Sequence, residues 1–287
     1  MQTHQIKNNR MSLTVSEHGA EITSIQLDGT ERMWDADPAF WGRTAPVLFP
    51  IVGALKDNTY RYAGGTYTMG QHGFARDMDF TLTDQTEDKL EFTLSDNEET
   101  YEKYPFHFQL QITYEVFQNE CRVTWKVKNT DEKTMYFQIG GHPAFAVPCE
   151  GGMIRDDYSV RAGESPLLEV AFLDKGLLGQ EKELHSNEFV LEDDTFVRDA
   201  FILQNDTIGH LDIVNHLSNQ VKVRVSADVP VWGIWSTADK KAPFVCLEPW
   251  YGRCDKEDFE GELSEREYMQ SLEPGEEFTG GYQMELL

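Results

Sequence analysis

Two histidines and one glutamate lie in short stretches whose neighbouring residues would suit proton transfer. The stretch QHGFARD, residues 71–77, places His72 and Arg76 on either side of a glycine. Histidine has a reference pKa of about 6.5 and can give or take a proton at neutral pH. The guanidinium of arginine holds oxygen atoms with a rigid fork of donors. An ordinary turn, in which Arg76 pairs with Asp77 or Asp79, would also account for this stretch.

The second and third stretches supply another imidazole and a carboxylate. In QIGGHPAFAVP, residues 138–148, two glycines precede His142 and indicate backbone that a ligand approaches closely. The alternative is a bulge at a strand end, with His142 bonded to a carbonyl. In VCLEPWYG, residues 245–252, Glu248 stands among apolar side chains. Loss of hydration raises the pKa of such a carboxyl toward the range of a general base, although a buried pair with an arginine is the competing interpretation.

Weaker signals come from scattered aromatic and charged side chains. An aromatic face beside hydrogen-bonding groups suits a sugar, because the ring stacks on C–H faces while polar groups bind hydroxyls. Each of these residues, taken singly, could instead belong to the core or to a surface ion pair. They are Trp41, Arg43, Asp199, Trp232, Trp235 and Trp250.

Alternation of apolar and polar residues predicts the elements that would position these groups. Residues 108–116 and 121–127 alternate with period two around a QNE turn, which predicts a long antiparallel hairpin. Residues 90–94 and 221–225 alternate too, and residues 57–69 predict two short strands around Gly64 and Gly65. Residues 95–104 form the best helix candidate, with capping-box spacing between Ser95 and Glu98. We therefore expect one all-β domain over residues 1–287, a large twisted antiparallel β-sandwich.

Composition narrows the classes of partner. The chain has 287 residues, a formal net charge of -25 and a pI of about 4.6, which would repel nucleic acid and anionic lipid. The N-terminus has no apolar core of signal-peptide length, and no apolar run approaches a membrane span. The four cysteines form no C-x-x-C pair, and His210 and His216 have no usual metal-ligand spacing. We expect a cytoplasmic protein, a monomer or homodimer, without cofactor or metal.

In combination, the segments GRTAPVLFPIVG, YTMGQHGFARDMDF, GGHPAF, DAFIL and CLEPWYG resemble the aldose 1-epimerase (galactose mutarotase) superfamily, and most closely its LacX-like branch. The resemblance implies a supersandwich of two large antiparallel sheets. It also implies interconversion of the α and β anomers of a hexose or hexose phosphate. The setting GGHPAF differs from the N-H-x-Y-F setting of the galactose enzymes, which puts galactose in doubt as the substrate.

The resemblance also assigns roles to residues. It implies that Glu248 is the general base and His142 the general acid, while His72 binds and polarises the sugar. Asp199 and Arg43 would bind hydroxyls, and Arg76 matches an arginine of the sugar-phosphate-acting relatives. A sugar-binding or sugar-sensing protein without turnover, using aromatics such as Trp41 and Trp250, remains the alternative.

Overall fold

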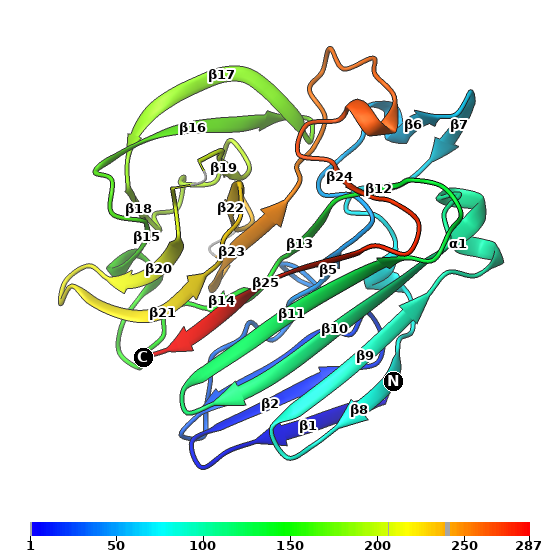
Figure 1. Cartoon of the computed structure of the whole chain (residues 1–287). Helices are drawn as coiled ribbons and strands as arrows, with labels where there is room; N and C mark the ends of the chain where they lie inside the picture. The colour runs from blue at the N-terminus through cyan, green and yellow to red at the C-terminus, as the bar shows by residue number, and fades with distance from the viewer. Residues whose placement is uncertain (1, 206, 239–241) are drawn as a thin grey trace.

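Antiparallel sheets make up nearly all of the regular structure. The computed structural model describes residues 2–205, 207–238 and 242–287. The largest sheet has nine strands and curves along one side of the molecule (Figure 1). Its strands, in spatial order, are β18 (Glu188–Val190), β15 (Tyr158–Ala162), β20 (His210–Asn215), β21 (Gln220–Ser226), β25 (Glu277–Leu286), β11 (Glu120–Asn129), β10 (Phe108–Phe117), β9 (Lys89–Ser95) and β8 (Thr81–Gln85).

A second sheet of eight strands carries the segments of His142 and Glu248. Its central strands, β22 and β23, lie between the two edges that Figure 1 labels β17 and β5. The order is β17 (Leu177–Ser186), β16 (Leu167–Asp174), β19 (Phe201–Leu203), β22 (Val231–Trp235), β23 (Phe244–Tyr251), β13 (Ile139–Gly141) and β5 (Val47–Leu48), with β14 (Ala144–Ala146) also paired to β23.

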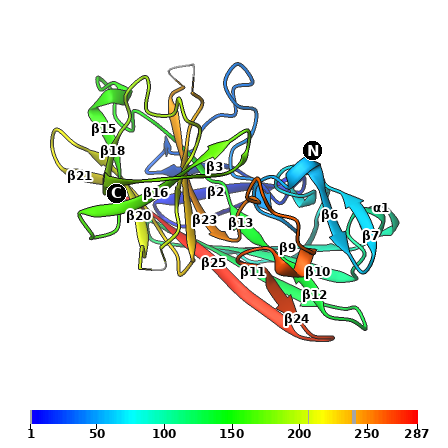
Figure 2. The same ribbon diagram turned by 90° about the horizontal axis from the view of Figure 1, so that it is seen from above.

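Smaller elements complete the structure. The hairpin β6–β7 and helix α1 lie at one end of the molecule, and β15 and β21 lie at the other (Figure 2). A four-stranded sheet contains β1 (Thr3–Lys7), β2 (Met11–Ser16), β3 (Ile22–Leu27) and β4 (Thr30–Glu31), and two pairs are formed by β6 (Thr59–Tyr62) with β7 (Gly65–Thr68) and by β12 (Met135–Phe137) with β24 (Gln270–Leu272). The helices are α1 (Glu98–Lys103) and the 3-10 turns Lys56–Asn58, Ala75–Asp77, Arg155–Asp157 and Leu263–Glu265.

The all-β prediction and its main hairpins are confirmed. Strands β10 and β11 form the predicted antiparallel hairpin, with Ile112 opposite Trp125, and both of these side chains are buried. The predicted hairpin β6–β7 also forms, but it turns at Ala63 and Gly64, one residue earlier than expected, because Tyr62 pairs with Gly65. The helix is shorter than expected because the N-cap is Asn97 and not Ser95. The Asn97 side chain accepts a hydrogen bond of 2.9 Å from the backbone N–H of Thr100. This N–H is one of those in the first turn that have no partner within the helix.

Strand β23 separates the core from the second face of its sheet. Val245 and Leu247 pack into the main hydrophobic core. Their neighbours Cys246 and Trp250 belong to separate apolar clusters on the opposite face. Because side chains alternate along a strand, Glu248 shares that opposite face, directly across from Gly233 of β22.

None of the described residues forms a helix long and apolar enough to cross a membrane. The cytoplasmic location stays a prediction.

Candidate active site

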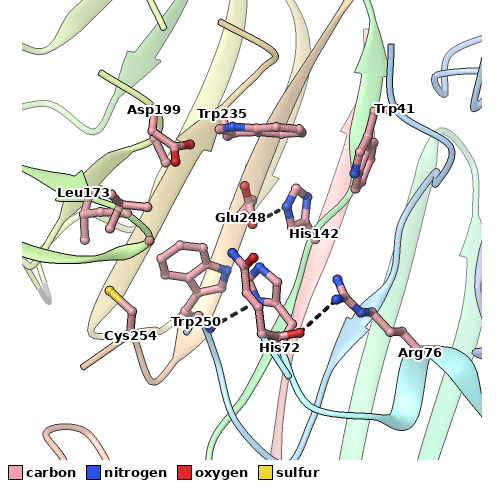
Figure 3. A pocket seen from close by; sticks show the side chains of 15 residues that line it. Trp41, His72, Arg76, His142, Leu173, Asp199, Trp235, Glu248, Trp250 and Cys254 are labelled. Atoms are coloured by element: carbon pink, nitrogen blue, oxygen red, sulfur yellow. Dashed lines mark hydrogen bonds and ion pairs between the residues drawn. The ribbon is translucent and has the colours of Figure 1, made fainter. Parts of the chain in front are cut away.

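A cavity of about 270 Å³ opens on this second face of β22 and β23. Side chains from well-separated parts of the chain converge on it, and Asp199 and Arg76 lie on opposite sides of the view in Figure 3. The lining residues are Trp41, Gly53, Gln71, His72, Arg76, His142, Leu173, Gly176, Asp199, Ala200, Ile202, Trp235, Glu248, Trp250 and Cys254. Seven of the eight residues predicted for the site are therefore brought together.

His142 and Glu248 are in direct contact in this cavity. His142 Nε2 lies 3.2 Å from Glu248 Oε2, and the two residues are 7% and 1% exposed. His142 follows β13, which pairs with β23, so neighbouring strands bring the two side chains together. Trp41 stacks on the imidazole at 4.8 Å, and Trp235 meets it edge-on at 5.6 Å. The aromatic rings fix the orientation of the imidazole and exclude water from one side of the pair.

Burial shifts the pKa values of this pair in opposite directions. Burial, and then the nearby negative charge of Asp199, raises the pKa of Glu248 well above its ordinary value, against the opposing effect of the Trp250 side chain. Burial, and then the positive charge of Arg76, lowers the pKa of His142 to about 3. Burial therefore favours a carboxylic acid beside a neutral imidazole. That form holds one proton, the same number as a carboxylate beside an imidazolium.

His72 is held differently. Its Nδ1 accepts a hydrogen bond of 3.1 Å from the backbone N–H of Gly53, so the neutral ring carries its proton on Nε2. The backbone of His72 has a φ of +67°, a conformation that side chains rarely adopt. Gly73 follows it because a Cβ there would lie 2.3 Å from the Phe49 carbonyl oxygen. Burial, and then the charges of His142 and Arg76, lowers the pKa of His72 well below its ordinary value, which makes His72 a neutral hydrogen-bond donor.

The two predicted arginines have different positions. Arg76 lines the cavity, and its Nη2 donates a hydrogen bond of 2.8 Å to the carbonyl oxygen of Gln71 (Figure 3). Arg43 is absent from the lining, because its Nη2 donates to Asp77 Oδ1 at 2.6 Å and its Nη1 to the Arg76 carbonyl at 3.4 Å. The expected contact of Arg43 with a sugar hydroxyl stays a prediction. In such a contact the Arg43 guanidinium would have to leave the carboxylate of Asp77.

The glycines near His142 make room for protein side chains, and the expected approach of a ligand to them is not what the structure shows. A Cβ on Gly140 would lie 2.7 Å from Cδ1 of Trp250, and one on Gly141 would lie 2.8 Å from Tyr282. Gly233 has the same function, since its Cβ would lie 2.7 Å from the Trp250 ring. Gly140 and Gly233 thus flank Trp250 and let its ring lie flat against the sheet beside the cavity.

Sequence reasoning left Trp235 as a weak signal beside Trp232. The structure separates them, since Trp235 lines the cavity, whereas Trp232 is in the core and its Nε1 donates to the Ile208 carbonyl at 2.7 Å. Three residues apart on a strand, they must face opposite sides. The pairing of β22 with β23 decides which of the two tryptophans shares the face of Glu248. Periodicity along one strand does not give this pairing. Leu173, Gly176 and Cys254 carried no sequence signal.

Comparisons with known proteins agree with this arrangement. A family model described as aldose 1-epimerase matches residues 2–285. The chain belongs to the aldose 1-epimerase family. Among members with solved structures, a galactose mutarotase related enzyme from Lactobacillus acidophilus is 38% identical, with a TM-score of 0.95 over 100% of this chain and 97% of that one. A galactose mutarotase-like protein from Lactobacillus casei ATCC 334 is 31% identical, with a TM-score of 0.92 and full coverage of both chains.

The LacX branch of the aldose 1-epimerase family also contains close relatives. Chromosomal protein LacX of Lactococcus lactis subsp. lactis is 33% identical over 267 residues, which cover 87% of this chain and 88% of LacX. The galactose mutarotase-like β-sandwich and the LacX-like branch, both expected from the sequence, are confirmed by these relatives.

Proposed function

We propose that this protein is a mutarotase that interconverts the α and β anomers of a free or phosphorylated hexose by general acid–base catalysis. The observation that carries the proposal is the contact of His142 with Glu248 inside a cavity lined by tryptophans. Family membership supports the reaction class.

Ring opening of a pyranose needs two coordinated proton transfers. The O1 hydroxyl loses a proton while the ring oxygen gains one, the C1–O5 bond breaks and an aldehyde forms. Rotation about C1–C2 and the reverse transfers close the ring on the other face. In the proposed roles, the carboxylate of Glu248 takes the O1 proton and the imidazolium of His142 protonates the ring oxygen. Each such transfer by a positioned group contributes about 10²–10⁴-fold.

The proton count of the pair matches this chemistry. The carboxylic acid and neutral imidazole become the reactive carboxylate and imidazolium when one proton passes between the two groups, which lie 3.2 Å apart and would be aligned for this transfer by the bound sugar. After ring opening the carboxyl holds the O1 proton and the imidazole is neutral again. Ring closure reverses both transfers, so the pair is restored in each cycle without exchange with solvent.

The remaining lining residues suit a sugar. A cavity of about 270 Å³ is slightly smaller than the 300–1,000 Å³ typical of drug-sized ligands, which suits a single monosaccharide. Trp41, Trp235 and Trp250 offer apolar ring faces, and Asp199 can accept hydroxyl protons. His72 would donate its Nε2 proton to a sugar oxygen and stay neutral during the reaction. Arg76 brings a positive charge to the lining and would contact a hydroxyl or a phosphate.

Anomer-exchange NMR on a panel of hexoses and hexose 6-phosphates tests the proposal. We expect exchange above the buffer rate for at least one class, with saturation in sugar concentration. Saturable sugar binding with exchange no faster than in buffer would overturn it and favour a sugar-binding protein without turnover.

A further inference from the structure

A third potential ligand atom lies beside the proposed acid–base pair. Cys246 precedes Glu248 by two residues on β23, so both side chains emerge from the same face. One ligand atom each from His142, Cys246 and Glu248 lie within 4.8 Å of one another, and all three residues are buried. Among the residues that the structure describes, this is the group of histidine, cysteine and acidic side chains that meets in this way.

Two polar atoms of the group are unsatisfied. Within the described part of the chain, Glu248 Oε2 and His142 Nδ1 are buried and have no hydrogen-bond partner. The 3.2 Å approach of His142 Nε2 to Glu248 Oε2 is therefore a close contact without hydrogen-bond geometry. Buried polar atoms without partners cost about 1–3 kcal/mol each. An ion that accepted an electron pair from Glu248 Oε2 would remove the cost of that atom.

We propose that His142, Cys246 and Glu248 form a binding site for a thiophilic divalent cation of the zinc class, and that the bound ion switches the proposed acid–base pair off. Sulfur, imidazole and carboxylate are the donors that Zn²⁺ uses, and three protein ligands with one open position form a common tetrahedral arrangement. The adjoining cavity supplies the open position. The inhibitory half of this inference rests on the proposed mutarotase function, whereas the metal-binding half does not.

The geometry is close to that of a loaded site. Ligand atoms about 2.0–2.3 Å from a tetrahedral zinc ion lie roughly 3.3–3.8 Å from one another. The contact between His142 and Glu248, at 3.2 Å, already has that spacing. The ligand atoms of the three residues lie up to 4.8 Å apart. To bind zinc, the most widely separated of them would have to move about 1 Å closer together. A thiolate and a carboxylate would neutralise the charge of the ion, so no net charge would be buried.

Ion binding and catalysis compete for the same lone pairs. A carboxylate that holds the ion cannot take the O1 proton, and an imidazole that holds it cannot carry a proton to the ring oxygen. Binding must also displace the protons of the thiol and the carboxyl. The affinity for the ion should therefore rise with pH, and the inhibition should be reversed by a chelator.

Cobalt titration of the full-length protein tests the site directly, because Co²⁺ takes zinc positions and shows a near-ultraviolet charge-transfer band when a thiolate binds it. We expect this band in the wild-type protein and its loss on addition of Zn²⁺. Cys246→Ser and Cys246→Ala should abolish it and weaken zinc binding by at least about 100-fold, beyond what the loss of an outer-shell partner costs. Cys254→Ser is the matched control, because Cys254 is buried and lines the same cavity but lies outside the group; it should keep the band.

Three outcomes would overturn the proposal: no band in the wild-type protein, a band that survives in both Cys246 variants, or a band that is lost only in Cys254→Ser. Thermal unfolding of each variant confirms that it is folded, and two different replacements of Cys246 guard against a local packing defect. Zinc inhibition is measured for each variant as the ratio of its own exchange rates with and without zinc. A cobalt band in a protein that exchanges no sugar would sink the mutarotase proposal and leave the metal site intact.

Discussion

His72 Nδ1 accepts a hydrogen bond from the backbone N–H of Gly53, whereas the Nδ1 of His142 has no hydrogen-bond partner among the described residues. The two imidazoles meet edge-on in the same cavity, with ring centroids 5.7 Å apart. The first is fixed in one neutral tautomer, and the second lies 3.2 Å from Glu248, its proposed partner in proton transfer. This difference divides their proposed roles into hydrogen-bond donation and proton transfer.

The role of His72 as a donor predicts a selective defect in His72→Asn, since asparagine tolerates the positive φ of this position. Loss of one preorganised donor should lower kcat by roughly 10²-fold and leave the acid limb of the pH profile in place. Anomer-exchange NMR at several pH values measures both. A displaced acid limb would show that His72 itself carries the transferred proton.

Glu248→Gln should remove the proton acceptor and keep the shape of the side chain. We expect the catalysed exchange rate to fall by about 10²–10⁴-fold, while sugar binding measured by calorimetry is retained. Glu102→Gln, at an exposed position of α1, is the control and should behave as wild type. Full activity in Glu248→Gln would remove this carboxyl from the mechanism.

The same Glu248→Gln substitution should alter stability as a function of pH. Glu248 has a raised pKa in the folded protein, so above the ordinary pKa of 4.5 the unfolded chain releases this proton while the folded chain keeps it. Wild-type stability is therefore lost as pH rises, by up to about 1.4 kcal/mol per pH unit from this group. Glutamine does not ionise, so the variant should gain in Tm relative to wild type between pH 5 and 8. A constant Tm difference across that range would contradict the raised pKa.

Arg76 should set the acid limit of activity. Its positive charge contributes to the lowered pKa values of His142 and His72. In Arg76→Gln both pKa values should rise toward 6.5, because this repulsion is gone, and the fall of kcat/KM on acidification should begin at higher pH. Arg76→Lys keeps the charge and should retain the wild-type profile. Identical profiles for the glutamine and lysine variants would exclude the electrostatic role.

Gly140→Ala should change the shape of the cavity by displacing Trp250, which lines it. The new Cβ would lie 2.7 Å from Cδ1 of Trp250, so the indole must move toward the sugar site. We expect weaker sugar binding and a stability loss of about 1–3 kcal/mol, measured by calorimetry and denaturant unfolding. Gly209→Ala, where a Cβ meets nothing within 4 Å, is the control. Unchanged sugar binding in Gly140→Ala would mean that Trp250 does not contact the ligand.

Much of the fold was predictable because period-two alternation marks half-buried strands directly, as in β10 and β11. The predicted helix cap was wrong because serine and asparagine are both good N-cap residues. The choice between Ser95 and Asn97 depends on where the preceding strand β9 ends, and that strand includes Ser95. Glu248 and the two histidines stood out because polar groups in apolar or glycine-rich settings are costly without a partner. The roles assigned to them came from family resemblance, since spacing along a chain does not say which side chains meet.

Other features required coordinates. Arg43 could have reached the cavity or Asp77, and only the position of the Ala75–Asp77 turn decides between them. Cys246 looked like an ordinary core residue, because its distance from His142 depends on the pairing of three strands. The face of the sheet on which Trp235 lies likewise depends on the register of strand pairing. A shift of one residue would move its side chain to the other face, and the sequence does not fix the register.

The distribution of indole rings provides the protein with its own optical probe. Three of its six tryptophans line the cavity, and the others, Trp34, Trp125 and Trp232, are buried within the apolar clusters. Intrinsic fluorescence should therefore contain two separable signals, one quenched or shifted when a small molecule enters the cavity and one that changes only when the molecule unfolds. Ligand binding in the cavity and unfolding of the protein can therefore be followed in one sample without an added fluorescent label.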